Sequence, residues 1–252
     1  MKNNLLRDFD YQSLVRKYFI PIILVLILIP SVYTGSHTLL ATDNPEGVIN
    51  NPDSGIEVGD GLLLIILDGV GRDIMLDSEY MPFLNSQQDS SGLMNLETGP
   101  LTLSANCVKE MMTGVPNAPI DGLNNFKLPH PGGSDPWLLA AQDERYSVGM
   151  IGSYVMGNMF GEYSNIEFID TFRGHSDYYE GDNDSFNILN DWLDSKKHNV
   201  ISTHFSGSDK VGHTWGKIGI DFKEKVIDLD SKLESIFSKL PPQWTVIVTA
   251  DH

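Results

Sequence analysis

The chain has 252 residues, of which 41% are hydrophobic and 10% aromatic, enough for one sizeable domain with a hydrophobic core. Its 17 basic and 34 acidic residues give a net charge of -17, which repels phosphate backbones and argues against a nucleic-acid partner. A single cysteine, Cys107, excludes an internal disulfide and a cysteine-rich zinc site. A metal ion in this protein must therefore be held by oxygen and imidazole ligands.

An uncharged apolar run at 18–33 follows a polar stretch that contains four basic residues. The run is slightly short for a membrane span and slightly long for the core of a signal peptide. No small-x-small cleavage site follows it, so we expect an uncleaved membrane helix at 18–34, with a cleaved signal as the alternative. The basic residues then place 1–17 in the cytoplasm and the rest of the chain on the extracytoplasmic side. Residues 35–60, rich in Gly, Ser, Asn, Pro and Asp, predict a tether to a folded domain at 61–252.

Six aliphatic residues at 62–67 lie directly before Asp68 and are bounded by Gly61 and Gly69. The pattern predicts a strand that is covered on both faces, as in a parallel sheet with helices on either side. In such sheets, ligands bind at the carboxyl ends of the strands. Asp68 is therefore well placed for chemistry, although an Asp that caps the next helix gives the same pattern.

A loop with Gly99 and Pro100 leads into an amphipathic stretch that Gly114 and Pro116 end, which predicts a helix. Ser104 falls at the N-terminus of this helix. A hydroxyl there is either an N-cap or a nucleophile that the positive end of the helix dipole favours. The free amides of the same turn favour phosphate.

The remaining elements follow from apolar spacing. Helices are predicted at 81–86, 137–142 and 222–240, with a short one through Phe186, Leu189 and Leu193, and strands at 147–151, 166–169, 199–205 and 244–249. The aromatic and acidic segment 172–184 is expected to be a loop that either shapes a substrate pocket or is simply solvated.

Acidic residues and histidines follow two of these strands. The strand at 199–205 opens onto Asp209 and His213, whose spacing of four allows one helical turn to aim both at an ion, or to hold them as a surface pair. The strand at 244–249 ends at Asp251 and His252. With Asp68, three such groups meet at one edge of a parallel sheet. Oxygen and nitrogen ligands with a hydroxyl between them are what a two-metal hydrolytic site requires.

Together these motifs resemble the alkaline phosphatase superfamily, within it the type I phosphodiesterase/nucleotide pyrophosphatase group, and especially the catalytic domain of GPI ethanolamine phosphate transferases. The resemblance covers 62–252 and rests on LLLIILDGVGRD, MPFLNS, PLTLSANCVKEMMTGVP, HFSGSDKVGH and VIVTADH, in the family's order. It implies an α/β, alkaline-phosphatase-like fold with a mostly parallel sheet and helices on both faces. It also implies two divalent metal ions, usually Zn²⁺.

Site residues also follow from the resemblance. One ion would be held by Asp68, Ser104, Asp251 and His252, and the other in part by Asp209 and His213. The family nucleophile, often a Thr, lies ten residues before the Gly of a Thr-Gly pair. That position is Ser104 here, with Thr102 as the fallback.

The family supplies a further His to the second ion beyond its Asp-His pair. Because two ligands make a poor zinc site, we expect the catalytic domain at 61–252 to be a fragment that is incomplete at its C-terminus, with activity that depends on the missing ligand.

Three functions remain open. Attack by water on the phosphorylated serine makes a phosphodiesterase or nucleotide pyrophosphatase, whereas attack by a glycan hydroxyl makes a transferase of phosphoethanolamine from a lipid. The third is a non-catalytic, membrane-tethered binding domain. A sulfatase is excluded because the sequence from Ser104 to Val108 does not match C/S-x-P-x-R.

Overall fold

The computed structural model describes residues 15–40, 59–132 and 135–252. The chain divides into two compact units, Met1–Ala41 with Ala118–Ile120, and Thr42–Asn117 with Asp121–His252. Most of the predicted segments 1–17 and 35–60 lies outside the described residues.

The N-terminal unit contains a long apolar helix. A π-helical turn, η1 (Val15–Phe19), leads into α2 (Ile20–Leu40). The segment Val15–Ser36 has a mean hydropathy of 2.1 and contains no buried residue, so by length and composition it suffices to cross a membrane. The apolar helix predicted here is therefore confirmed, and a signal sequence shares these features.

The larger unit is built on a five-stranded sheet in which every neighbouring pair is parallel. Its order is β3-β2-β4-β1-β5. The strands are β1 (Gly61–Leu67), β2 (Val148–Gly152), β3 (Ile166–Asp170), β4 (Val200–Phe205) and β5 (Trp244–Thr249). Each strand begins and ends within one residue of the predicted bounds, so these predictions are confirmed.

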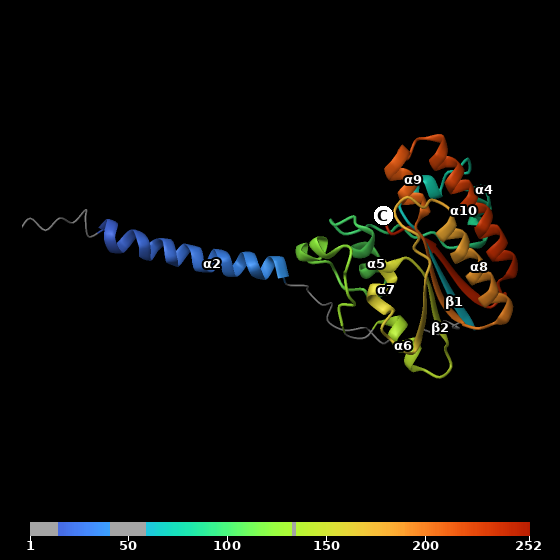
Figure 1. Ribbon diagram of the computed structural model, residues 1–252, viewed down its shortest axis with the longest axis horizontal. Coiled ribbons are helices and arrows are strands. Elements are labelled where there is room, and N and C mark those ends of the chain that lie inside the picture. Colours follow the sequence, from blue (N-terminus) through green and yellow to red (C-terminus); the bar gives the residue numbers. More distant parts are fainter. Residues whose placement is uncertain (1–14, 41–58, 133–134) are drawn as a thin grey trace, which may run out of the picture. The chain divides into compact units, whose positions relative to one another are not determined.

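Helices cover the sheet from both faces (Figure 1). The helical elements are α3 (Arg72–Met75), α4 (Pro82–Ser86), η2 (Gln88–Ser90), α5 (Ser104–Thr113), η3 (Pro119–Asn124), α6 (Pro136–Gln142), α7 (Tyr154–Phe160), α8 (Glu180–Ser195), α9 (Gly207–Trp215) and α10 (Ile220–Lys239).

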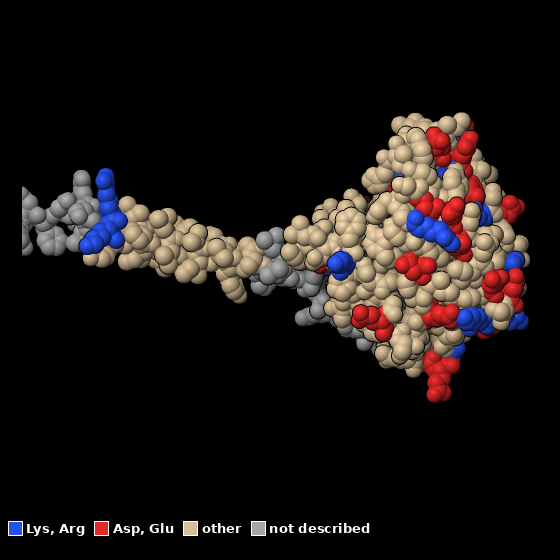
Figure 2. All heavy atoms as spheres, in the orientation of Figure 1, with Lys and Arg blue, Asp and Glu red and all other residues tan. Residues whose placement is uncertain are grey.

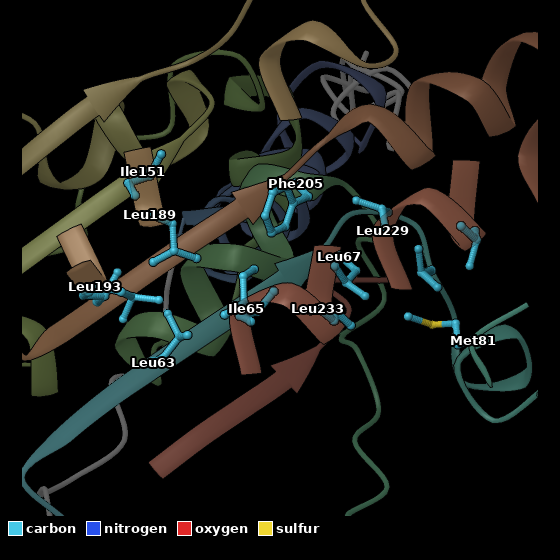
Figure 3. Close-up of a cluster of buried hydrophobic side chains, with 14 of the residues drawn as sticks. Leu63, Ile65, Leu67, Met81, Ile151, Leu189, Leu193, Phe205, Leu229 and Leu233 are labelled. Atoms are coloured by element: carbon cyan, nitrogen blue, oxygen red, sulfur yellow. The ribbon is translucent and has the colours of Figure 1, made fainter. Parts of the chain in front are cut away.

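Side chains of β1 alternate between two hydrophobic cores, because successive residues of a strand point to opposite faces. Leu63, Ile65 and Leu67 pack with residues of α8 and α10 (Figure 3). Leu64 and Ile66 pack with residues of α5, α6 and α7. Burial on both faces explains why the whole strand is aliphatic, and it fixes the point where the chain leaves the sheet at Asp68.

The predicted loop at 172–184 is wrong in its second half, because α8 begins at Glu180. The start is stabilised by Asp177, whose Oδ1 accepts hydrogen bonds from the backbone N–H groups of Tyr179 and Glu180 and whose Oδ2 accepts from Gly181. A carboxylate that satisfies the free amides of a first turn favours a helix there. The predicted short helix through Leu189 is therefore sixteen residues long.

Candidate active site

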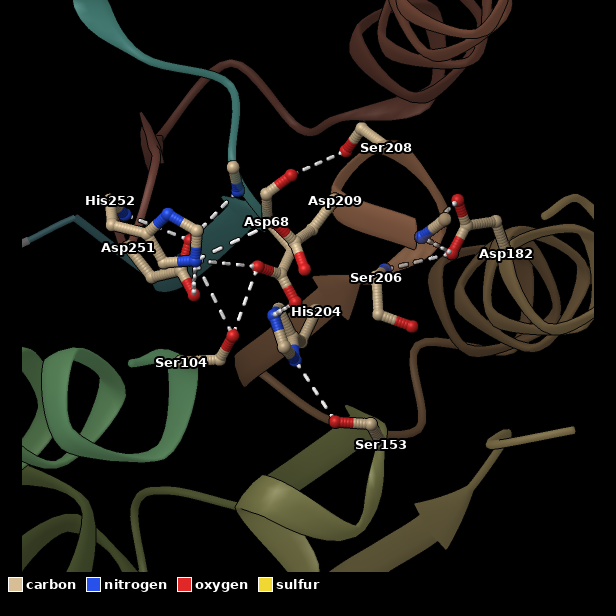
Figure 4. A network of polar contacts seen from close by, with 12 residues as sticks. Asp68, Ser104, Ser153, Asp182, His204, Ser206, Ser208, Asp209, Asp251 and His252 are labelled. Carbon is tan, nitrogen blue, oxygen red and sulfur yellow. Dashed lines mark hydrogen bonds and ion pairs between the residues drawn. The ribbon is translucent and has the colours of Figure 1, made fainter. Parts of the chain in front are cut away.

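Acidic and histidine side chains meet at the carboxyl edge of the sheet. Strands β4, β1 and β5 are adjacent and parallel, so they end at the same edge. Asp68 follows β1, Asp251 and His252 follow β5, and Asp209 lies in α9, which begins two residues after β4 ends. Figure 4 shows these side chains facing one another.

Asp68 lies at the centre of this cluster and is 5% exposed. Its Oδ2 lies 3.3 Å from Nε2 of His204, and its Oδ1 lies 3.3 Å from Nε2 of His252. Each carboxylate oxygen therefore faces a different imidazole. Two groups with the composition of a metal site share this residue, Asp68 with His204 and Asp251, and Asp68 with Asp209 and His252.

Ser104 is the first residue of α5, and the N-cap position belongs to Leu103. Within the part of the chain that the structure describes, no side chain caps the turn. Its Oγ instead donates a hydrogen bond to Oδ1 of Asp68 at 3.2 Å and lies 3.5 Å from Nε2 of His252. The N-cap reading of Ser104 is therefore wrong, and its hydroxyl faces the acidic cluster. Thr102 is exposed in the loop before the helix.

His204 belongs to the cluster, yet the sequence patterns do not identify it. It occupies the last but one position of β4 and is 1% exposed. Its Nδ1 lies 3.3 Å from Oγ of Ser153, while Nε2 faces Asp68. Within an apolar strand a histidine has the appearance of a core residue. The signal that was available is its position one residue before the carboxyl end of a buried strand.

Asp209 and His213 lie one turn apart on α9, with Nε2 of the imidazole 3.3 Å from Oδ2 of the carboxylate. The side chain of His213 is 79% exposed, whereas that of Asp209 is 17% exposed. Oδ1 of Asp209 lies 3.9 Å from Nε2 of His252. The structure thus brings Asp209 into the cluster and leaves His213 at its outer side.

The loop after β1 is held closely against α9. Gly69 has a φ of +69°, and a Cβ there would lie 2.9 Å from Oδ1 of Asp209. A side chain at this position is disfavoured both by the backbone conformation and by the space available. Ser208 donates a hydrogen bond from Oγ to the backbone oxygen of Asp68 at 2.6 Å. These contacts fix the separation of Asp68 and Asp209.

Two buried polar atoms of the cluster lack a hydrogen bond among the described residues. Oδ1 of Asp251 accepts hydrogen bonds from the backbone N–H groups of Gly69 and His252, but its Oδ2 accepts none and lies 3.8 Å from Nε2 of His252. Nε2 of His204, although 3.3 Å from Asp68, lies off the direction of a good hydrogen bond. Unpartnered buried polar atoms are rare and point to a missing ion or water.

The carboxylates of the cluster shift one another's pKa values. Burial and then the negative charge of Asp68 raise the pKa of Asp251 to about 7. Burial and Asp68 also raise the pKa of Asp209. Burial alone would raise the pKa of Asp68, but the nearby imidazoles of His204 and His252 outweigh it and hold that pKa well below its usual range.

Both imidazoles favour their charged forms in response. The hydrogen bond to Asp68 raises the pKa of His252 to about 9 against the opposing effect of burial. Burial lowers the pKa of His204, but Asp68 outweighs it and the net shift is upward. The cluster therefore attracts positive charge, and its carboxylate and imidazole groups are the ligands that Zn²⁺ and similar divalent ions take. These residues fit a metal ion.

Three comparisons with known proteins bear on this site. The family model described as type I phosphodiesterase / nucleotide pyrophosphatase matches residues 121–252, just over half of the chain. No curated protein sequence matches.

Solved structures provide the third comparison. Murine ectonucleotide pyrophosphatase / phosphodiesterase 5 is similar over 76% of this chain and 57% of that chain, with 15% identity and a TM-score of 0.56. The chain thus spans 57% of the length of this relative, which shares its fold. An inactive variant of the murine protein in complex with AMP is 14% identical, with a TM-score of 0.49, over 76% of this chain and 56% of that chain. The PH0037 protein from Pyrococcus horikoshii is 11% identical, with a TM-score of 0.41, over 78% of this chain and 80% of that chain.

Proposed function

Because the chain belongs to the type I phosphodiesterase / nucleotide pyrophosphatase family, we propose that the cluster around Asp68 hydrolyses phosphodiester bonds with divalent metal ions and Ser104 as the nucleophile. One observation carries the proposal. The Ser104 hydroxyl lies at a helix N-terminus, within 3.2 Å of Asp68 and 3.5 Å of His252. A hydroxyl beside carboxylate and imidazole ligands is what metal-assisted covalent catalysis needs.

In this proposal two groups of residues hold the ions. They are Asp68 with His204 and Asp251, and Asp68 with Asp209 and His252, with Ser104 beside both groups and His213 available at the outer side of the second. Zinc suits such mixed oxygen and nitrogen ligands. Bound ions of this kind lower the pKa of a nearby hydroxyl and offset the negative charge on the phosphoryl oxygens.

The chain's own residues supply the rest of the chemistry. Asp68 accepts the hydrogen bond of Ser104 and so orients Oγ towards phosphorus. The first turn of α5 has no side-chain cap, which leaves its N–H groups to stabilise an anion. Oγ of Ser104 forms a bond to phosphorus and loses its proton to solvent, and the bond to the leaving alcohol breaks. The intermediate joins Ser104 through phosphate to the remaining alcohol of the substrate. Water then attacks its phosphorus, releases a phosphate monoester and restores the hydroxyl.

The apolar helix supports a second, finer candidate. We propose that α2 is an uncleaved anchor with the catalytic unit on the extracytoplasmic side, where membrane-borne substrates are within reach. An acceptor hydroxyl on a glycan would then replace water, and the protein would transfer phosphoethanolamine from a lipid.

The test uses the full chain with Zn²⁺ and bis(p-nitrophenyl) phosphate. We expect hydrolysis that a chelator abolishes, and a loss of at least about 1,000-fold in kcat for Ser104→Ala. The matched control is Ser231→Ala, which removes an exposed hydroxyl of α10. An activity that survives in Ser104→Ala and is lost in Thr102→Ala would show that Thr102 is the nucleophile instead of Ser104.

Two other outcomes would change the proposal. A protein that binds the ion and hydrolyses no diester would be a non-catalytic binding domain. Release of phosphoethanolamine from a lipid only in the presence of a glycan acceptor would establish the transferase instead of the hydrolase.

A further inference from the structure

The two ring nitrogens of His204 face different partners. Nε2 lies 3.3 Å from Oδ2 of Asp68 and makes no hydrogen bond among the described residues. Nδ1 lies 3.3 Å from Oγ of Ser153, and both of these side chains are buried (Figure 4). One nitrogen is therefore available to an ion that binds in the cluster, while the other meets a hydroxyl.

Ser153 occupies a position at which a serine usually caps a helix. It is the N-cap residue of α7, yet among the described residues its side chain accepts no hydrogen bond from the first turn. An N-cap hydroxyl normally satisfies one of the free N–H groups there and stabilises the helix. In this protein the hydroxyl lies against the imidazole of His204 instead. Helix α7 thus lacks a side-chain cap, and the serine contacts the candidate site.

Gly152 allows this contact. Strands β2 and β4 are paired as far as Ile151 and Thr203, so the next residues, Gly152 and His204, come close together. A Cβ at Gly152 would lie 2.8 Å from Cβ of His204 and 3.2 Å from its backbone oxygen, and the φ of +155° also favours glycine. The end of β2 therefore lies directly against His204, which brings Ser153 within reach of Nδ1.

We propose that Ser153 is a positioning residue, whose Oγ accepts a hydrogen bond from Nδ1–H of His204 and so keeps the lone pair of Nε2 aimed at a divalent ion. The inference rests on the metal-dependent chemistry proposed above, and it adds a residue outside both candidate metal groups. A neutral imidazole carries its proton on one nitrogen and binds a metal through the other, so the partner of the first nitrogen orients the second. Ser153 acts through His204 alone.

A second pair of serine and histidine, at the other end of the same strands, provides a matched comparison. Oγ of Ser147 lies 2.8 Å from Nδ1 of His198, whose Nε2 lies 3.1 Å from Oε2 of Glu167. The contacting atoms are the same, but this pair lies just before β2 and β4 begin, and the candidate metal groups found among the described residues do not include it. Loss of the Ser147 hydroxyl therefore shows what such a contact contributes to the fold alone.

The first experiment measures Zn²⁺ binding to the full chain by calorimetry. For Ser153→Ala we expect Kd to rise about 10- to 100-fold, the usual effect of removing a group that orients a metal ligand, and for Ser147→Ala we expect a change of less than about threefold. The chain has a net charge of -17, and acidic side chains are spread over the face shown in Figure 2. The titration is therefore done at physiological ionic strength, which screens weak binding of Zn²⁺ to the surface.

A conservative variant separates the hydroxyl from the packing around it. Ser153→Thr keeps the hydroxyl, so it should retain most of the Zn²⁺ affinity that Ser153→Ala loses. Equal Kd values for Ser153→Ala and the parent chain would overturn the proposal. Equal losses in Ser153→Ala and Ser147→Ala would overturn it too, because they would show a general effect on the fold.

A measurement on the parent chain needs no variant at this position. Nitrogen NMR of the Zn²⁺-loaded protein, with ¹⁵N-labelled histidine and the His204 ring assigned through bonds from its backbone, reports which ring nitrogen carries the proton. We expect the proton on Nδ1. A proton on Nε2 would overturn the proposal, because that nitrogen then has no lone pair for the ion.

The binding experiment also gives a result that is separate from hydrolysis. If the parent chain binds Zn²⁺ but leaves bis(p-nitrophenyl) phosphate intact, the proposed function fails, while the Kd of Ser153→Ala still decides the role of Ser153. If the diester is hydrolysed and Ser153→Ala binds Zn²⁺ as tightly as the parent chain, the proposed function stands and the positioning role of Ser153 is rejected.

Discussion

Two charged clusters lie at the same edge of the sheet, one around Asp68 and one around Lys225 and Asp182, and they differ in how their charges are balanced. Figure 4 shows the first cluster and Asp182 of the second. Nζ of Lys225 lies 2.9 Å from Asp182 and 3.2 Å from Asp228, and Asp228 also pairs with Lys232.

In the cluster around Asp68, three carboxylates face two imidazoles, and Oδ2 of Asp251 accepts no hydrogen bond from any described residue, although Nε2 of His252 lies 3.8 Å from it. A buried charge that has its counter-ion can serve the fold alone. A buried polar atom without a partner points instead to a bound ligand that satisfies it.

The balanced cluster also positions the unbalanced one. Oδ1 of Asp182 accepts hydrogen bonds from the backbone N–H groups of Ser206 and Gly207, at the start of the helix that carries Asp209. A Cβ at Gly207 would lie 2.2 Å from the backbone oxygen of Tyr178, so only glycine allows this close approach. The ion pair thus fixes where α9 begins.

The largest expected effect comes from breaking the balanced pair. Lys225→Met leaves Asp182 buried without its counter-ion, and we expect the free energy of unfolding to fall by about 3–5 kcal/mol. The measurement is urea unfolding at pH 7. The control is Lys239→Met, which breaks a partly exposed pair with Asp194 and should cost less than about 1 kcal/mol.

A double variant shows whether the missing charge is the cause. Lys225→Met with Asp182→Asn removes both charges and keeps an amide oxygen for the N–H groups of Ser206 and Gly207. We expect this variant to recover most of the lost stability. If it is as unstable as Lys225→Met alone, lost packing rather than unpaired charge explains the effect.

A smaller effect is expected when a ligand of the unbalanced cluster is removed. Asp68 belongs to both candidate metal groups. Asp68→Asn should therefore raise the Kd for Zn²⁺ by about 100-fold or more. Mutation of residues that merely orient the ligands of a metal already costs about 10- to 100-fold in affinity, and Asp68 would be a ligand itself. Calorimetric titration with Zn²⁺ measures this, with Asp184→Asn on the surface of α8 as the control. A Kd within threefold of the parent chain would refute the metal site.

The two clusters also differ in how far their residues could be predicted from the sequence. Buried parallel strands must be apolar, so the strands and the edge at which Asp68 and Asp251 meet could be predicted. The function of Asp182 could not, because its partners lie 24 residues away in Ser206 and further on in Lys225. His204 was missed for a related reason, since only the neighbouring strand reveals that it faces a carboxylate.

The smallest expected effect is a change in the pH dependence of stability without metal. The pKa of Asp251 is about 7 in the folded protein, against 3.8 for a free carboxyl. Between these values the folded state holds a proton that the unfolded state has released, so this stabilisation is complete below about pH 4 and is lost as the pH rises through about 7. Asp251→Asn stays neutral throughout and keeps an oxygen for the N–H of Gly69.

Unfolding of the two proteins is therefore compared from pH 4 to pH 8 in a chelator. From pH 4 to pH 8 we expect the free energy of unfolding of the parent chain to fall by on the order of 2 kcal/mol relative to that of Asp251→Asn. Adding Zn²⁺ should reverse the order at pH 8, because a ligand that binds only the folded state stabilises it and the variant lacks one binding group. Asp89→Asn, at an exposed position of η2, should follow the parent chain in both conditions. Parallel curves for the parent chain and Asp251→Asn would mean that Asp251 carries no uncompensated charge, and the contrast with the Asp182 pair would be lost.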